Sequence, residues 1–220
     1  SSDVCSSDLD DVVSIRSVSH ALAQCTQGQE LCIARLPLGW NGAYRDFHHP
    51  MDYLGADGGG GIGAGPGNAI GVALALRDLG SDRLPVALLG DGDFLMGNTA
   101  VWTAVRYGIP LLIIVCNNHS FFNDELHQER VAKERGRPVE NKWIGQRMSE
   151  PEIDIAQMAR SMGAVGIGPI RRASELPQAL QEAVERVRAG QVCVVDACVA
   201  PGYDANMSGQ TASSSAAHKR

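Results

Sequence analysis

Two short polar motifs carry the residues best suited to chemistry, and each follows a run of apolar residues. Asp91 lies in LLGDGDF, at the end of the run 84–90, and Asn118 lies in VCNNHS, at the end of the run 110–117. Gly90 and Gly92 let the backbone turn sharply and approach an anion closely. The interval between the motifs holds one turn, one helix and one strand. Adjacent parallel strands would therefore bring Asp91 and Asn118 to the same edge of a sheet.

These residue types indicate a magnesium site that also binds phosphate. Mg²⁺ prefers oxygen ligands and is typically held by one or two carboxylates together with substrate phosphates. Asp91 supplies a carboxylate and Asn118 a neutral oxygen. Main-chain N–H groups near Gly92 and Asp93 would bind the phosphates, at the positive end of a helix expected to follow Met96. The motifs together predict a metal-bridged diphosphate.

The elements that must position these motifs alternate along the chain. Near-continuous apolar runs at 84–90, 110–117 and 191–199 are typical of parallel strands buried on both faces, and 30–38 and 164–170 predict shorter strands. Segments 11–26, 62–79, 98–108, 151–163 and 174–190 predict helices, and 36–61 predicts a long loop. This alternation predicts an α/β fold, a doubly wound and mainly parallel sheet with helices on both faces.

Composition favours one domain that acts on small molecules. The chain has 220 residues, 44% of them hydrophobic, and a formal net charge of −6. We expect a leader at 1–9, one domain at 10–205 and a tail at 206–220. The negative charge argues against nucleic acid or an anionic membrane as a partner. No apolar stretch is long enough to cross a bilayer. Six scattered cysteines without CxxC spacing favour a reducing cytoplasm.

The segment from GDG to NN, GDGDFLMGNTAVWTAVRYGIPLLIIVCNN, resembles the signature of thiamine diphosphate (TPP) enzymes, in particular the acetolactate synthase-like group. The resemblance implies that Asp91, Asn118 and the main-chain carbonyl of Ser120 hold Mg²⁺. Upstream, GGIGAGPGNAIGVALAL is similar to the glycine-rich entry to a helix in that family, which implies that Ile62 supports the bent thiamine. The cofactor-binding residues expected from motif and resemblance together are Ile62, Gly90, Gly92, Asp93 and Asn118.

The resemblance also implies what a complete enzyme would need. It implies a transferase or lyase that decarboxylates or ligates 2-oxo acids, as a homodimer or homotetramer. In that family a Glu that activates the cofactor lies on a separate pyrimidine-binding domain of the same or a partner chain. No such domain is recognisable in this sequence. We therefore expect this chain to be inactive, or nearly so, by itself.

Other interpretations remain open at this stage. The chain could be a free-standing subunit of a 2-oxo-acid oxidoreductase, although its cysteines lack iron–sulfur spacing, or a non-catalytic cofactor-binding remnant. The stretch GGGGIGAG also satisfies the GxGxxG pattern of nicotinamide and flavin sites, but no clear strand precedes it.

Three histidines and one charged stretch are weaker candidates for function. His48, His49 and His119 could act as general acids or bases near neutral pH, although isolated histidines more often pack or cap. The stretch DELHQERVAKERGRPVENK (124–142) predicts a solvated helix and loop. Its closeness to Asn118 along the chain suggests a mobile lid as a hypothesis.

Overall fold

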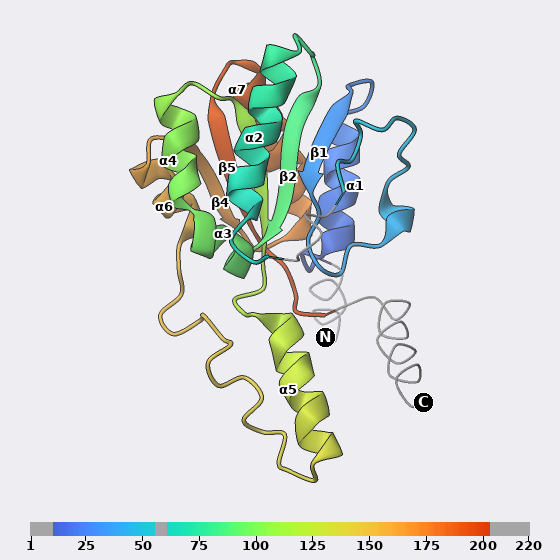
Figure 1. Cartoon of the computed structure of the whole chain (residues 1–220), viewed down its shortest axis with the longest axis vertical. Helices are drawn as coiled ribbons and strands as arrows, with labels where there is room; N and C mark the ends of the chain where they lie inside the picture. The colour runs from blue at the N-terminus through green and yellow to red at the C-terminus, as the bar shows by residue number, and fades with distance from the viewer. Residues whose placement is uncertain (1–10, 56–60, 203–220) are drawn as a thin grey trace, which may run out of the picture.

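The computed structural model describes residues 11–55 and 61–202, so the expected leader 1–9 and tail 206–220 lie outside the described residues. Five strands form one parallel sheet in the order β1-β2-β3-β5-β4 (Figure 1). The strands are β1 (Leu31–Arg35), β2 (Leu84–Gly90), β3 (Leu111–Asn117), β4 (Val165–Ile170) and β5 (Val192–Cys198). The predicted parallel α/β fold is confirmed.

Helices cover both faces of this sheet (Figure 1). One face packs against α1 (Ile15–Cys25) and α7 (Leu176–Arg188). The other packs against α2 (Gly65–Asp78), α4 (Thr99–Arg106) and α6 (Ile155–Ser161). Shorter elements are α3 (Asp91–Gly97), η1 (Gly42–Tyr44) and η2 (Ala173–Glu175). Helices therefore bury both faces of the sheet, which explains why its central strands are apolar throughout.

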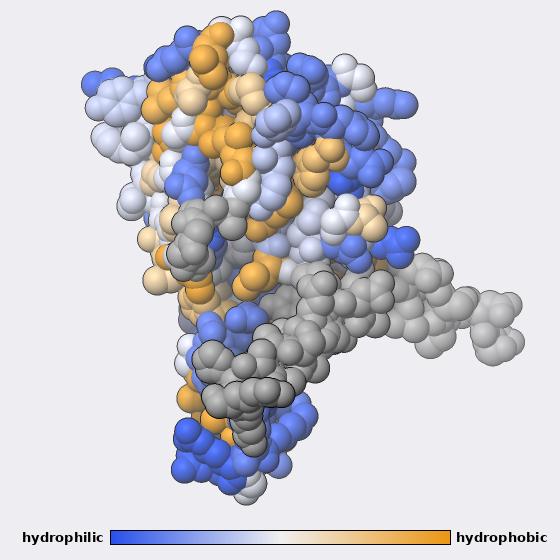
Figure 2. All heavy atoms as spheres, turned by 45° about the vertical axis from the view of Figure 1, so that its right-hand side comes forward, coloured by the Kyte–Doolittle hydropathy of each residue, from blue (hydrophilic) through white to orange (hydrophobic). Residues whose placement is uncertain are grey.

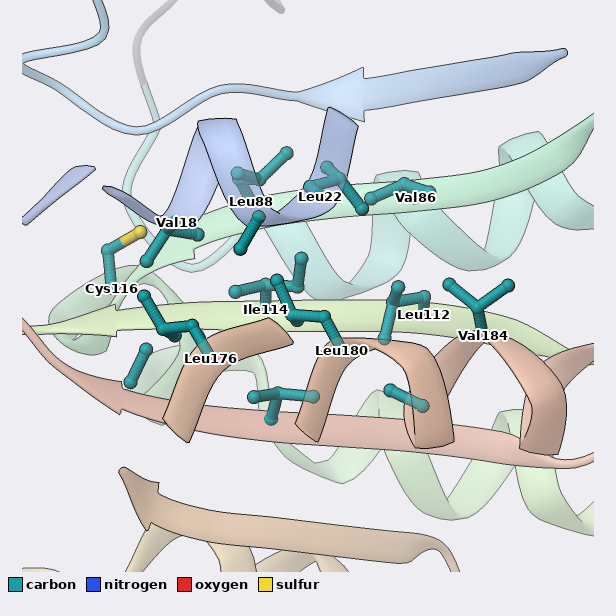
Figure 3. Packing of buried hydrophobic residues seen from close by; sticks show 14 of the residues in the cluster. Val18, Leu22, Val86, Leu88, Leu112, Ile114, Cys116, Leu176, Leu180 and Val184 are labelled. Carbon is teal, nitrogen blue, oxygen red and sulfur yellow. The ribbon is translucent and has the colours of Figure 1, made fainter. Parts of the chain in front are cut away.

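The central strand β3 shows why these sequences fold as they do. Every residue of β3 is buried, and successive side chains point to opposite faces. Leu112 and Ile114 pack toward α1 and α7, together with Leu22 and Leu180 (Figure 3). The residues that alternate with them in β3 point to the other face of the sheet and pack with α2, α4 and α6. This core fixes the place where β2 and β3 end.

Local signals define the ends of several helices. Ser14 and Ser17 form a capping box at the start of α1, and the side chain of Asp154 accepts from the N–H of Gln157 at the start of α6. A proline stands in the first turn of both α2 and α7, where its missing N–H has no helical partner. These caps agree with the predicted segments to within a few residues.

A long arm, residues 122–145, leaves the sheet domain at the carboxyl edge of the strands (Figure 1). It consists of α5 (Phe122–Glu134) and the segment that returns from it. Figure 2 shows that this projecting part is largely hydrophilic on the face in view. The predicted solvated helix and loop are thus confirmed. Within the described ranges, no helix has the length and apolarity to cross a membrane.

Candidate cofactor site

The two polar motifs meet at the carboxyl edge of the sheet. Gly90, the last residue of β2, is in register with Cys116 of β3. Asp91 follows β2 and Asn118 follows β3, and both side chains accept from the same main-chain group. The N–H of Ser120 donates to Asp91 Oδ2 and to Asn118 Oδ1, each over 3.0 Å. The structure therefore brings together the three residues expected to hold a metal.

Burial shapes the chemistry of Asp91. The residue is 3% exposed, and burial raises the pKa of its carboxyl from 3.8 to about 6. Hydrogen bonds from the N–H groups of Gly92 and Ser120 stabilise the ionised form and limit the rise in this pKa. A cation beside Asp91 would stabilise the ionised form further.

The donor set matches a hard cation that keeps other ligands. Among the described residues, no group of three or more His, Cys, Asp or Glu could hold a metal ion. Asp91 and Asn118 offer one carboxylate and one amide oxygen, which suits Mg²⁺ only when phosphates or water complete its shell. A metal here would therefore keep several positions of its shell for ligands from outside the protein.

The glycines of the motif differ in what surrounds them. A Cβ added at Gly90 would have no heavy atom within 4 Å, whereas one added at Gly92 would lie 2.3 Å from Cε1 of Phe121. Gly90 thus leaves room beside the backbone for a ligand. Gly92 is required because the ring of Phe121 packs against it.

The helix expected to follow Met96 is present as α4, but its amino end does not carry Gly92 and Asp93, because an unpredicted helix lies before it. Strand β2 runs directly into α3, whose first residue is Asp91. A residue of extended conformation, Gly90, caps this helix, and α4 follows it as a separate helix. The N–H groups of Gly92 and Asp93 therefore belong to the first turn of α3, where N–H groups have no main-chain carbonyl of the helix to bond, and that of Gly92 donates to the side chain of Asp91.

The Asp93 side chain has a partner that sequence reasoning missed. Its Oδ2 pairs with Nε of Arg35 at 2.9 Å. Its Oδ1 accepts from the N–H groups of Gly63 and Gly65, at 2.6 and 3.1 Å. The Asp93 carboxylate thus ties the glycine-rich segment, which carries Ile62, to the start of α3 and the end of β1. The available signal was Arg35 itself, a charged residue that ends the apolar run LCIAR.

A pocket of about 290 Å³ opens beside these residues. The expected site residues Ile62, Gly90 and Asp93 line it, and Ile62 is 47% exposed. His48, His49 and His119 are not among its lining residues. The expected residues Asp91, Gly92, Asn118 and Ser120 line it too. The lining also includes residues that sequence reasoning did not assign to the site: Ile15, Arg35, Leu36, Tyr53, Phe121 and Phe122.

Comparison with known proteins identifies the family. Residues 38–197 match the family model described as thiamine pyrophosphate enzyme, C-terminal TPP binding domain. The chain belongs to this family. It is 30% identical over 176 residues to the acetolactate synthase large subunit of Haemophilus influenzae, an alignment that covers 78% of the chain and 28% of that protein. It is 29% identical over 156 residues to the acetolactate synthase isozyme 3 large subunit of Escherichia coli, covering 71% and 25%.

Solved structures agree on the fold. The TPP-binding domain superposes on benzoylformate decarboxylase from Polynucleobacter necessarius with a TM-score of 0.71 and 19% identity, covering 87% of this chain and 34% of that one. It superposes on a 4-hydroxybenzoylformate decarboxylase from Rhodococcus jostii with a TM-score of 0.69 and 23% identity, covering 88% and 33%. The chain spans about 28% of the length of the Haemophilus relative.

Proposed function

We propose that this TPP-binding domain holds the diphosphate of thiamine diphosphate through Mg²⁺, as part of an enzyme that decarboxylates or ligates 2-oxo acids. The metal ligands would be the side chains of Asp91 and Asn118 and the main-chain carbonyl of Ser120. The observation that carries this proposal is the convergence of Asp91 Oδ2 and Asn118 Oδ1 on the N–H of Ser120.

The main chain of Ser120 supports its expected role. Ser120 forms an antiparallel bridge with Arg147, and the bridging hydrogen bonds belong to the residues on either side of it. In such a pair the N–H and C=O of the middle residue both point away from the partner strand. The N–H of Ser120 points to Asp91, so we expect its carbonyl on that same side, where the metal would lie.

The domain would contribute binding and orientation to the reaction. When bound, thiamine diphosphate supplies the carbanion-stabilising chemistry that cleavage beside a 2-oxo group needs. Gly90 would let the diphosphate approach the backbone, and Asp93 would hold the segment that carries Ile62 against the pocket. These residues fix the cofactor relative to the sheet edge.

The rest of the active site would come from a second domain. The relatives named acetolactate synthase are more than three times as long as the stretch they share with it, which supports a domain of a larger enzyme over an independent oxidoreductase subunit or a non-catalytic remnant. We propose a pyrimidine-binding domain, on the same or a partner chain, as the second half of the site, and a homodimer or homotetramer as the assembly. A cytoplasmic location stays a prediction.

Titration calorimetry with thiamine diphosphate, with and without Mg²⁺, tests the proposed function. We expect binding that requires the metal and that Asp91→Ala reduces below detection, because the metal would lose its only carboxylate ligand. Glu182→Ala is the control, since Glu182 is a carboxylate of α7 that pairs with Arg186 and does not line the pocket. Equal affinity in the wild type and Asp91→Ala would contradict the proposal.

A further inference from the structure

The arm begins and ends beside the expected metal ligands. The N–H of Phe121 donates to the carbonyl of Gln146 at 3.0 Å, and the N–H of Met148 donates to the carbonyl of His119 at 2.8 Å. Between these bonds lies the bridge of Ser120 with Arg147. Residues 118–120, here called the metal loop, are therefore paired along one side with the segment that returns from the arm.

One carboxylate contacts both sides of this pairing. Glu125 lies in the first turn of α5, and its Oε1 accepts a short hydrogen bond from the Oγ of Ser120. The same oxygen accepts from Nε of Arg147 at 3.4 Å. Glu125 thus joins the metal loop to the returning segment.

Glu125 is also the buried residue of an otherwise solvated helix. It is 3% exposed, and no other residue of α5 is buried. A buried carboxylate costs free energy unless hydrogen bonds compensate for its lost hydration. A helix that buries only a carboxylate therefore gains little from apolar packing, and the contacts of Glu125 with Ser120 and Arg147 account for its burial.

The metal loop needs such support because its backbone is strained. His119 has a φ of +56°, in the left-handed region that residues other than glycine seldom adopt. Such a conformation persists only where surrounding contacts fix it. The N–H of His119 donates to Asn117 Oδ1 at 3.0 Å on one side of the strained residue. On the other side, Ser120 is held between Asp91, through its N–H, and Glu125, through its hydroxyl.

We propose that Glu125 is a positioning residue, which holds the main chain of Ser120 in place for the metal. This inference rests on the proposed function, since it assigns to the arm a role in cofactor binding. Glu125 does not line the pocket and touches no cofactor ligand other than Ser120. It acts through Ser120, directly and through Arg147, which pairs with Ser120.

Glu129 provides a matched control on the same helix. It lies one turn beyond Glu125 and accepts from Lys133 Nζ at 2.5 Å and from Lys142. Both of its partners belong to the arm. Removing Glu129 therefore loosens the returning segment around Lys142 but leaves the hydrogen bonds between 119–121 and 146–148 in place, so it controls for a loosened arm.

The test compares Glu125→Ala, Glu125→Gln and Glu129→Ala by two measurements. The first is amide hydrogen exchange at residues 119–121 without metal or cofactor. The second is the calorimetric affinity for thiamine diphosphate at saturating Mg²⁺. We expect Glu125→Ala to speed the exchange and to weaken the affinity, each by about tenfold, because it removes a hydrogen bond to a charged group. Glu125→Gln keeps an oxygen for the Ser120 hydroxyl, so its exchange rate and its affinity should lie close to those of the wild type. Glu129→Ala should change neither the exchange rate nor the affinity.

The outcomes separate this inference from the proposed function. A wild type without metal-dependent binding overturns both. A wild type that binds, with unchanged affinity and exchange in Glu125→Ala, overturns only the role of Glu125, as does an equal loss in Glu129→Ala. Ser120→Ala removes the same hydrogen bond from its other end and keeps the main chain, so it carries the test if Glu125→Ala does not fold.

Discussion

The sheet and the arm meet at the candidate site, and they are held by different forces. Strand β3 is buried along its whole length between two apolar clusters. In α5, by contrast, the one buried residue is a carboxylate, and ion pairs link the helix to the returning segment. Apolar burial is insensitive to small changes in charge, whereas exposed ion pairs contribute little and are screened by salt. One half of the metal loop is thus attached to an apolar sheet and the other to an arm held by polar contacts.

The largest expected effect comes from the sheet. Ile114 is fully buried in β3, so Ile114→Ala should lower the free energy of unfolding by about 2 to 5 kcal/mol, through lost burial and the cavity left behind. Leu126 of α5 is 36% exposed, and Leu126→Ala should cost less than about 1 kcal/mol. Urea unfolding of both variants measures the contrast. Equal losses would show that the arm is part of the same cooperative core.

The next effect arises at Asp91, where the sheet half of the site carries a buried charge. Well below pH 3.8 the carboxyl is protonated in both the folded and the unfolded chain, and its raised pKa has no effect on stability. As the pH rises toward 6, the unfolded chain loses this proton first. The free energy of unfolding therefore falls, by about 2 kcal/mol between pH 4.5 and 7 for a pKa raised from 3.8 to about 6.

Metal-free urea unfolding at several pH values checks this dependence. Asp91→Asn cannot ionise at this position. The free energy of unfolding of the variant minus that of the wild type should therefore rise with pH, by the same amount that Asp91 costs the wild type. Mg²⁺ is left out because it would favour the ionised carboxylate. A difference between the two proteins that stays constant with pH would show that burial does not raise the pKa of Asp91.

Strong local patterns account for the part of the molecule that sequence reasoning predicted. Strand β2 runs from Leu84 to Gly90, as its apolar run predicts, and β3 begins one residue later than predicted. Runs that are apolar at every position are typical of parallel strands whose two faces are both covered by helices. The convergence of Asp91 and Asn118 follows from this topology, because both side chains come after adjacent parallel strands.

Contacts between distant polar residues could not be predicted in the same way. The pairing of 119–121 with 146–148, the Arg35–Asp93 ion pair and the burial of Glu125 join segments that carry no shared periodicity. Helix α3 was missed because the glycines on either side of Asp91 suggested a turn. In the structure, Gly90 caps a helix instead. The sequence therefore predicted the sheet half of the site better than the arm half.

The smallest expected effect tests how the arm stays closed. Lys142, in the returning segment, pairs with Glu129 of α5, whereas Lys133 pairs with the same carboxylate from within the helix. Lys142→Ala should therefore loosen the return of the chain and speed chymotrypsin cleavage after Trp143, which is 44% exposed, by roughly twofold to fivefold. Lys133→Ala should leave the rate unchanged, because it breaks no link between the two segments. If the arm closes over the cofactor as a lid, thiamine diphosphate with Mg²⁺ should slow cleavage of the wild type more than that of Lys142→Ala. Equal cleavage with and without cofactor would mean that the arm only supports the metal loop and does not move over the site.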